Sequence, residues 1–212
     1  MSGPGVVTID GPAASGKSSV AREVARRMGI PFVSSGLLYR GATWLVLQAA
    51  EPAQTEAGVM AELERHELEL LPGTQGNLLM IDGTARYAEL HTDEVDRHVS
   101  RVAGYGLVRD WANAQIKRLP GSFVVEGRDM GTVVFPNARH KFYLDAPVEL
   151  RAARRVGERE ADLAALTELL ARRDQADAKQ LEPAADALRI DTEFLGVGEV
   201  ADLIIARLQG GD

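Results

Sequence analysis

The sequence contains no cysteine, which excludes disulfide bonds and thiolate catalysis. It also lacks an excess of positive charge, because 24 Lys and Arg residues stand against 31 Asp and Glu residues and the formal net charge is −7. A chain of this charge repels a polyanionic duplex unless its positive groups gather on one face. We therefore expect no nucleic-acid polymer as a partner, whereas a small phosphorylated ligand held by a few arginines is compatible with the composition.

Long apolar runs are missing as well. No stretch reaches the length that crosses a bilayer, and the N-terminus shows neither the basic nor the apolar region of a secretory signal. The sequence thus predicts a cytoplasmic protein without a membrane partner, and the lack of a long exposed apolar stripe favours a monomer. The histidines lack the spacing of a metal site, and we interpret all four as surface or edge residues, namely His66, His91, His98 and His140.

Short apolar segments alternate with helical patterns along the 212 residues, a length that suits one α/β domain with small insertions. We predict the strands of a parallel sheet, covered by helices on both faces, at 6–10, 32–33, 123–126, 141–144 and 188–191. Helical patterns occupy 17–28, 37–50, 56–66, 92–103, 107–119, 147–158, 163–173 and 198–208. The alternating, turn-rich stretch 67–87 predicts a β-hairpin or a small three-stranded insertion.

Residues 11–18 match the phosphate-binding pattern G-x-x-x-x-G-K-[ST], and they follow a predicted strand and open a predicted helix. Glycines let such a loop curl until several N–H groups face one phosphate, and the helix adds its positive dipole end. We expect Lys17 to reach the β- and γ-phosphates of ATP and the Ser18 hydroxyl to hold Mg²⁺. The loop that would bind the nucleotide comprises Gly11, Pro12, Ala13, Ala14, Ser15, Gly16, Lys17, Ser18 and Ser19.

Arginines are concentrated on the predicted helix at 147–158. Arg151, Arg155 and Arg159 are spaced four residues apart, with Arg154 beside them, and such like-charge pairs cost about 0.2–0.5 kcal/mol each. One interpretation is a solvated face relieved by nearby glutamates. The other is a lid that closes arginines over a transferring phosphoryl group, where one arginine is worth about 10³-fold or more in rate.

Two further polar clusters follow predicted strands, at the edge where open α/β sheets bind ligands. Residues 34–40 follow the second strand, and residues 126–132 follow the third. Arg128 and Asp129 in the latter cluster could also simply pair with each other. A guanine-specific switch is disfavoured, because the sequence contains no Asn-Lys pair and therefore no Asn-Lys-x-Asp motif.

Four motifs together resemble those of the bacterial cytidylate kinases, and the resemblance runs from the first strand to the last helix. They are Thr-Ile-Asp-Gly-Pro at 8–12, Ser-Gly-x-x-Tyr-Arg at 35–40, Gly-Arg-Asp-Met-Gly-Thr-Val-Val-Phe-Pro at 127–136 and Arg-Asp-x-x-Asp at 173–177. The resemblance implies a P-loop kinase fold with a core formed by 1–34, 105–147 and 174–212. It also implies a nucleoside-monophosphate-binding region at about 35–104, which contains the β insertion, and a short arginine lid at about 148–173.

The same resemblance implies ATP- and Mg²⁺-dependent phosphorylation of CMP and dCMP. Arg40 and Arg173 would serve the acceptor phosphate and Asp177 its ribose. The implied substrate-binding residues are Ser35, Arg40, Ser100, Arg109, Arg128, Asp129, Arg173 and Asp177. The implied catalytic residues are Lys17, Arg128, Arg154 and Arg155.

Base chemistry agrees with part of this assignment. Cytosine offers an amino donor together with the N3 and O2 acceptors, so a carboxylate such as Asp129 favours it, while Arg109 and Ser100 can donate to N3 and O2. Uracil presents a carbonyl where cytosine has the amine. A kinase for UMP or dTMP and a non-enzymatic nucleotide-binding switch remain the alternatives.

Overall fold

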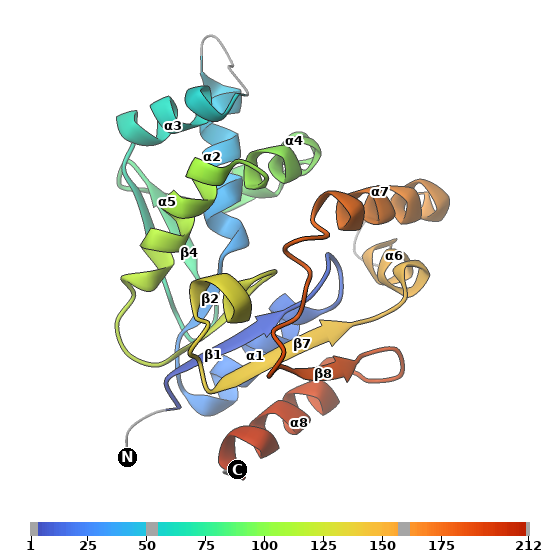
Figure 1. Cartoon of the computed structure of the whole chain (residues 1–212). Helices are drawn as coiled ribbons and strands as arrows, with labels where there is room; N and C mark the ends of the chain where they lie inside the picture. The colour runs from blue at the N-terminus through green and yellow to red at the C-terminus, as the bar shows by residue number, and fades with distance from the viewer. Residues whose placement is uncertain (1–3, 50–54, 157–161, 211–212) are drawn as a thin grey trace.

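A parallel sheet forms the centre of the computed structural model, which describes residues 4–49, 55–156 and 162–210. Within these ranges the sheet has the strand order β2-β6-β1-β7-β8, and all of its pairings are parallel (Figure 1). Its strands are β1 (Val6–Asp10), β2 (Phe32–Ser34), β6 (Phe123–Gly127), β7 (His140–Asp145) and β8 (Leu188–Asp191). Each predicted strand coincides with one of them or lies within it, so the predicted parallel sheet is confirmed.

Both faces of the sheet are covered at its inner strands, which explains why β1 and β6 read as apolar runs rather than as alternating patterns. All five residues of β6 are buried. Val124 packs into the cluster under α1 (Lys17–Met28) and α8 (Val197–Gln209), whereas Phe123 and Val125 pack into the cluster on the opposite face. Neighbouring residues of one strand therefore stabilise two different layers.

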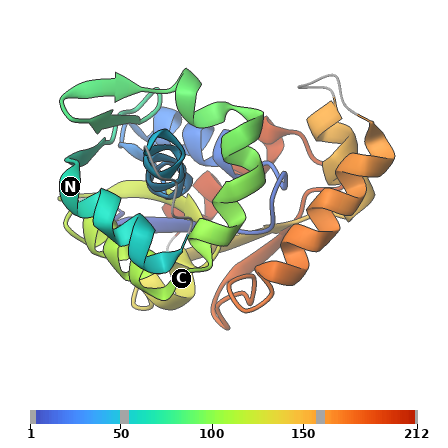
Figure 2. The same cartoon turned by 90° about the horizontal axis from the view of Figure 1, so that it is seen from above.

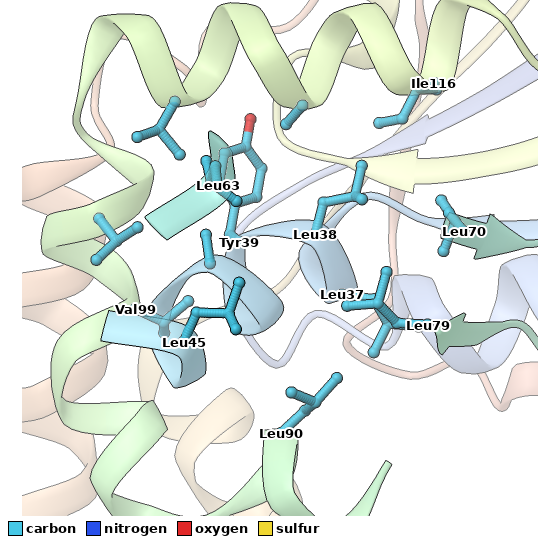
Figure 3. Close-up of a cluster of buried hydrophobic side chains, with 14 of the residues drawn as sticks. Leu37, Leu38, Tyr39, Leu45, Leu63, Leu70, Leu79, Leu90, Val99 and Ile116 are labelled. Atoms are coloured by element: carbon cyan, nitrogen blue, oxygen red, sulfur yellow. The ribbon is translucent and has the colours of Figure 1, made fainter. Parts of the chain in front are cut away.

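The opposite layer is built around α2 (Gly36–Gln48), whose side chains are buried on most sides. Leu37 of this helix lies beside Leu79 of the small sheet, whereas Leu45 lies beside Val99 (Figure 3). The elements that surround α2 are α3 (Glu56–Arg65), α4 (Asp93–Ala103), α5 (Gly106–Lys117) and the short turn η1 (Ala88–His91).

The stretch predicted as a hairpin or three-stranded insertion forms three antiparallel strands. They are β3 (Leu68–Leu71), β4 (Leu78–Ile81) and β5 (Thr84–Arg86), in the order β3-β4-β5. Leu70, Leu79 and Ile81 are buried against α2, whereas Leu71 and Leu78 face outward. The insertion is therefore held by one apolar face.

Two helices, α6 (Val148–Val156) and α7 (Leu163–Ala176), lie side by side at one end of the molecule. Figure 2 shows this orange pair away from the teal strands β3–β5. Ala152 of α6 and Leu170 of α7 pack against Ala13 of the glycine loop, so the pair rests directly on that loop. Arg159 and the end of the helix predicted for 147–158 lie outside the described residues.

The remaining helix predictions are confirmed to within three residues at either end, with α1 matching its predicted bounds. A π-turn, η2 (Met130–Val134), follows β6 and was not predicted from the sequence. Among the described helices none is both long and apolar enough to cross a bilayer. The proposed division into core, acceptor-binding region and lid remains a prediction.

The turn from β1 into the glycine loop gives a test of the fold. A Cβ at Gly11 would lie 2.2 Å from the backbone oxygen of Leu144. The φ angle of Gly11, +151°, is also one that residues with a side chain rarely adopt. We expect Gly11→Ala to lower the free energy of unfolding by about 2 kcal/mol or more, measured by urea denaturation. The matched control is Gly198→Ala in α8, where a Cβ meets only the end of the Arg27 side chain at 3.5 Å and helix propensity rises. Equal stability of the two variants would contradict this account of the turn.

Candidate active site

The glycine loop joins β1 to α1 and has the backbone geometry of an anion-binding concavity. Ala14 and Gly16 adopt left-handed conformations, with φ of 62° and 88°. Such residues turn successive N–H groups toward one point, and Gly16 leaves the N-terminus of α1 without a side-chain cap. The N–H groups of the first helical turn can therefore be offered to a ligand.

Lys17 begins α1 and reaches back over the loop. Its Nζ donates a hydrogen bond to the backbone oxygen of Pro12 at 2.9 Å. Burial lowers the pKa of Lys17 to about 8, although the nearby Glu126 carboxylate acts in the opposite direction. The ammonium group thus lies in a dry site, where its attraction for a phosphate is strengthened.

A cavity of about 500 Å³ extends from this loop to the turn between β8 and α8. Ala14 and residues 15–20 form one wall, and Leu195, Val197 and Val200 form an apolar wall opposite. Arg154 borders this cavity and is held by Thr192. Its Nη1 donates a hydrogen bond to the Thr192 hydroxyl at 3.0 Å, and its Nη2 donates one to the Thr192 backbone oxygen. We refer to this space as the donor cavity.

A second cavity, of about 350 Å³, lies on the other side of Lys17. We refer to it as the acceptor cleft. Six cationic side chains line it, namely Lys17, Arg40, Arg109, Arg128, Arg155 and Arg173. Only three carboxylates accompany them, those of Glu126, Asp129 and Asp177, so a cleft of formal charge +3 exists in a chain of charge −7. Positive charge is therefore gathered where a small anion can enter.

Arg128 and Asp129 are adjacent in the sequence but do not pair with each other. Arg128 Nε forms an ion pair with Asp177 Oδ2 at 2.8 Å, and Arg109 donates to Asp129. The interpretation that the two neighbours merely neutralise one another is wrong. Each of these carboxylates instead holds a guanidinium from a different element at the cleft wall.

Arg173 is the most exceptional of these cations. Burial, together with the neighbouring charges of Arg128, Arg155 and Arg40, lowers the pKa of Arg173 to about 10. Its Nε is buried and has no hydrogen-bond partner among the residues that the structure describes. A buried donor of this kind costs roughly 1–3 kcal/mol, so an incoming anion would be bound favourably.

The arginines of α6 do not form a solvated face. Arg151 is 4% exposed and donates to the Ala13 backbone oxygen at 3.0 Å and to Asp174 at 2.5 Å. It therefore fastens α6 to the glycine loop and to α7, which differs from the predicted role over a phosphoryl group. Arg155 is half-buried and lines both cavities.

Most of the predicted site residues lie together in the acceptor cleft. Residues of the loop and seven of the predicted substrate-binding residues line it, namely Ser35, Arg40, Arg109, Arg128, Asp129, Arg173 and Asp177. Ser100 does not line it, but faces an adjoining cavity between α4 and α7 together with Arg155 and Arg173. Gly11 and Pro12 line neither cavity and shape the turn beneath. His91, interpreted as a surface or edge residue, borders the cleft.

Two buried carboxylates were not assigned from the sequence. Asp10 accepts hydrogen bonds from the N–H groups of Met130 and Gly131 at 2.9 and 2.8 Å, and burial raises the pKa of Asp10 to about 6. Glu126 accepts from the Ser34 hydroxyl and lines the cleft. Both residues stand at the carboxyl end of an apolar strand, and an acidic residue in that position was the signal that could have identified them.

The parallel sheet, the glycine loop and the cationic cleft beside it define the chain as a P-loop phosphotransferase. The cytidylate kinase family model matches residues 7–210. The chain belongs to the cytidylate kinase family.

Individual relatives agree with this assignment over nearly the whole chain. The cytidylate kinase of Thermus thermophilus is 49% identical over 97% of this chain and 99% of its own length. That of Deinococcus radiodurans is 48% identical over 96% of this chain and 98% of its own. The cytidylate kinase of Bacillus subtilis is 36% identical over 96% of both chains.

Proposed function

We propose that the protein transfers the γ-phosphoryl group of ATP to CMP and dCMP, giving CDP and dCDP. The observation that carries this proposal is the position of the acceptor cleft, which opens beside Lys17 and contains both a cluster of guanidinium groups and the buried Asp129. Membership of the cytidylate kinase family supports the same reaction. No relative reported above favours a UMP or dTMP kinase or a nucleotide-binding switch. The cytoplasmic location and the monomeric state remain predictions.

ATP would bind with its triphosphate on the glycine loop and its nucleoside in the donor cavity. The loop geometry and Lys17 suit the phosphates, and the apolar wall at Leu195 and Val197 suits a purine base. Ser18 lines both cavities, and its hydroxyl is suited to Mg²⁺. An ion at Ser18 would be held otherwise by substrate phosphates and water, as is usual for Mg²⁺ at phosphate sites. When bound, Mg²⁺ would neutralise phosphate charge.

The acceptor nucleotide would place its base at Asp129 and its phosphate among Arg40, Arg128 and Arg173. Asp129 is 4% exposed and held by Arg109, so its carboxylate is fixed in one orientation toward an amino donor. The free Nε of Arg173 gives the phosphate a partner that the protein itself does not supply. Asp177, already paired with Arg128, would bind the ribose.

Catalysis by these residues consists of positioning and charge neutralisation. The acceptor phosphate is an anion already, so no general base is required, and the repulsion between two nucleotides is the main barrier. Lys17, Arg128 and Arg155 line the cleft next to the loop and would offset the charge that develops on the transferring group. Arg154 would support the donor side through its contact with Thr192.

The direct test measures ADP release with CMP, dCMP, UMP, AMP and GMP as acceptors. CMP and dCMP are expected to stimulate release far more than the other nucleotides. Lys17→Ala should lower the CMP-dependent rate by about 10³-fold or more, because the loss of one fixed charge at the phosphates removes transition-state stabilisation. Equal stimulation by all five acceptors, or a wild-type rate in the variant, would refute the proposal.

Asp129 generates a second prediction, about base preference. Asp129→Asn replaces an acceptor for the cytosine amine by a group that can also donate to the uracil carbonyl. The ratio of kcat/KM for CMP over UMP should fall roughly tenfold to a hundredfold, the worth of one hydrogen bond to a charged group. Asp110→Asn is the control, since Asp110 is exposed beside Arg109 and lies outside the cleft. An unchanged ratio would show that Asp129 does not read the base.

The lowered pKa of Lys17 predicts a pH dependence. The ammonium form exists below its pKa of about 8, so kcat/KM for ATP should fall as the pH rises through that value, by up to about tenfold per pH unit. Initial rates at low ATP and saturating CMP, measured across this pH range, report the fall in kcat/KM for ATP. Lys17→Arg retains a positive charge at all these pH values. Whatever its absolute rate, its kcat/KM for ATP should therefore not fall as the pH rises through about 8. A wild-type profile without a fall above pH 8 would contradict the assignment.

A further inference from the structure

The carboxylate of Asp96 joins two arginines of the acceptor cleft. Asp96 lies in the first turn of α4. Its Oδ1 accepts a hydrogen bond from Arg40 Nη2 at 2.6 Å, and its Oδ2 accepts one from Arg155 Nη2 at 3.1 Å. Arg40 belongs to α2, within the layer around the small sheet, whereas Arg155 belongs to α6, which packs against α7. One side chain thus links three helices.

This bridge is shielded from water, unlike most surface ion pairs. The side chains of Asp96, Arg40 and Arg155 are 12%, 16% and 19% exposed. Arg40 is further fixed by a hydrogen bond from Nη1 to the Leu90 backbone oxygen at 2.8 Å. Partly buried, multiply bonded pairs of this kind restrict rotamers, which exposed pairs do not.

The bridge leaves the guanidinium groups able to bind a phosphate. Each guanidinium carries five N–H donors, and Asp96 accepts one from each arginine. Both arginines line the acceptor cleft, while Asp96 lies outside its lining and borders the adjoining cavity. The carboxylate therefore stands behind the arginines rather than in the place of a ligand.

Arg155 lines the donor cavity as well as the acceptor cleft, so it lies where the two spaces meet. The neighbouring arginines of α6 have other anchors, since Arg151 contacts Asp174 and Arg154 contacts Thr192. Within the described part of the chain, Asp96 is the carboxylate that pairs with Arg155. The carboxylate of Asp96 also offsets the repulsion between Arg40 and Arg155.

We propose that Asp96 is a positioning residue for phosphoryl transfer, which holds Arg40 at the acceptor phosphate and Arg155 at the junction of the two cavities. The inference rests on the proposed function. Without the carboxylate, the two like charges would move apart, and the acceptor phosphate would meet guanidinium groups that are no longer oriented. The loss should fall mainly on the acceptor nucleotide, because Arg40 lines the acceptor cleft and not the donor cavity.

The test compares steady-state kinetics of the full-length wild type and Asp96→Asn. KM for CMP should rise about tenfold in the variant, the effect of one lost charge-assisted hydrogen bond, while KM for ATP changes less than about twofold. ATP hydrolysed per CMP phosphorylated should also rise, because water enters when Arg155 no longer closes the junction. A merely structural role would lower the amount of folded enzyme and leave both KM values and this ratio unchanged.

Glu94→Gln is the matched control. Glu94 lies in the same first turn of α4 and is exposed, so its removal changes the helix-terminal charge equally but leaves the arginines bridged. Urea denaturation verifies that the variants are folded. If Asp96→Asn does not fold, Asp96→Glu replaces it in the test, because glutamate keeps the negative charge on a longer side chain. KM for CMP should be higher in Asp96→Glu than in the wild type.

The outcomes separate the two proposals. If the wild type releases no ADP in response to CMP, the proposed function itself fails. If the wild type is active but Asp96→Asn matches Glu94→Gln, the positioning role is refuted. A lower KM for CMP in Asp96→Asn would refute it too, because the carboxylate would then compete with the phosphate. If Asp96→Glu is the variant that folds, and its KM for CMP equals that of the wild type, the inference is overturned.

Discussion

Repulsion among guanidinium groups is the constraint on which the rest of this site depends. The acceptor cleft holds five arginines and a lysine, and the pKa of Arg173 is lowered to about 10 because burial and its cationic neighbours disfavour another charge. Carboxylates offset part of this cost, since Asp129 pairs with Arg109, Asp177 pairs with Arg128, and Asp96 bridges Arg40 and Arg155. The net positive charge that remains favours the binding of an anion, which supports the proposed phosphorylated acceptor.

The parallel sheet makes this concentration of charge feasible. Since all of its strands point the same way, Asp10, Ser34 and Gly127 meet at one edge, where three loops leave the sheet. The hydrogen bonds from Met130 and Gly131 to Asp10 then tie the turn after β6 to the start of the glycine loop. The glycine loop and the acceptor cleft are thus both anchored to the same edge of the sheet. Because the sheet positions both of them, neither has to be ordered separately when a ligand binds.

Features that depend on residues close together in the chain could be predicted from the sequence, whereas contacts between residues far apart in the chain could not. The glycine loop, the strands and the small sheet each follow from residues close together in the chain. The partners of Arg128, Arg155 and Asp10 lie 49, 59 and 120 residues away along the chain, so no local pattern reveals them. The π-turn after β6 was missed for a related reason, because it is held by Asp10 rather than by its own composition.

The spacing of the arginines on α6 was interpreted as one stripe with one role, yet a helix turns its successive residues toward different neighbours. Arg151 contacts the glycine loop, Arg154 contacts Thr192 in the lining of the donor cavity, and Arg155 contacts Asp96 beside the acceptor cleft. Residues three and four apart point in similar but not identical directions, and here that small difference separates the two substrates. A single nine-residue helix therefore contacts the loop, the donor cavity and the acceptor cleft at once. Because residues of α6 line both cavities, we expect a displacement of this helix to alter the two cavities together.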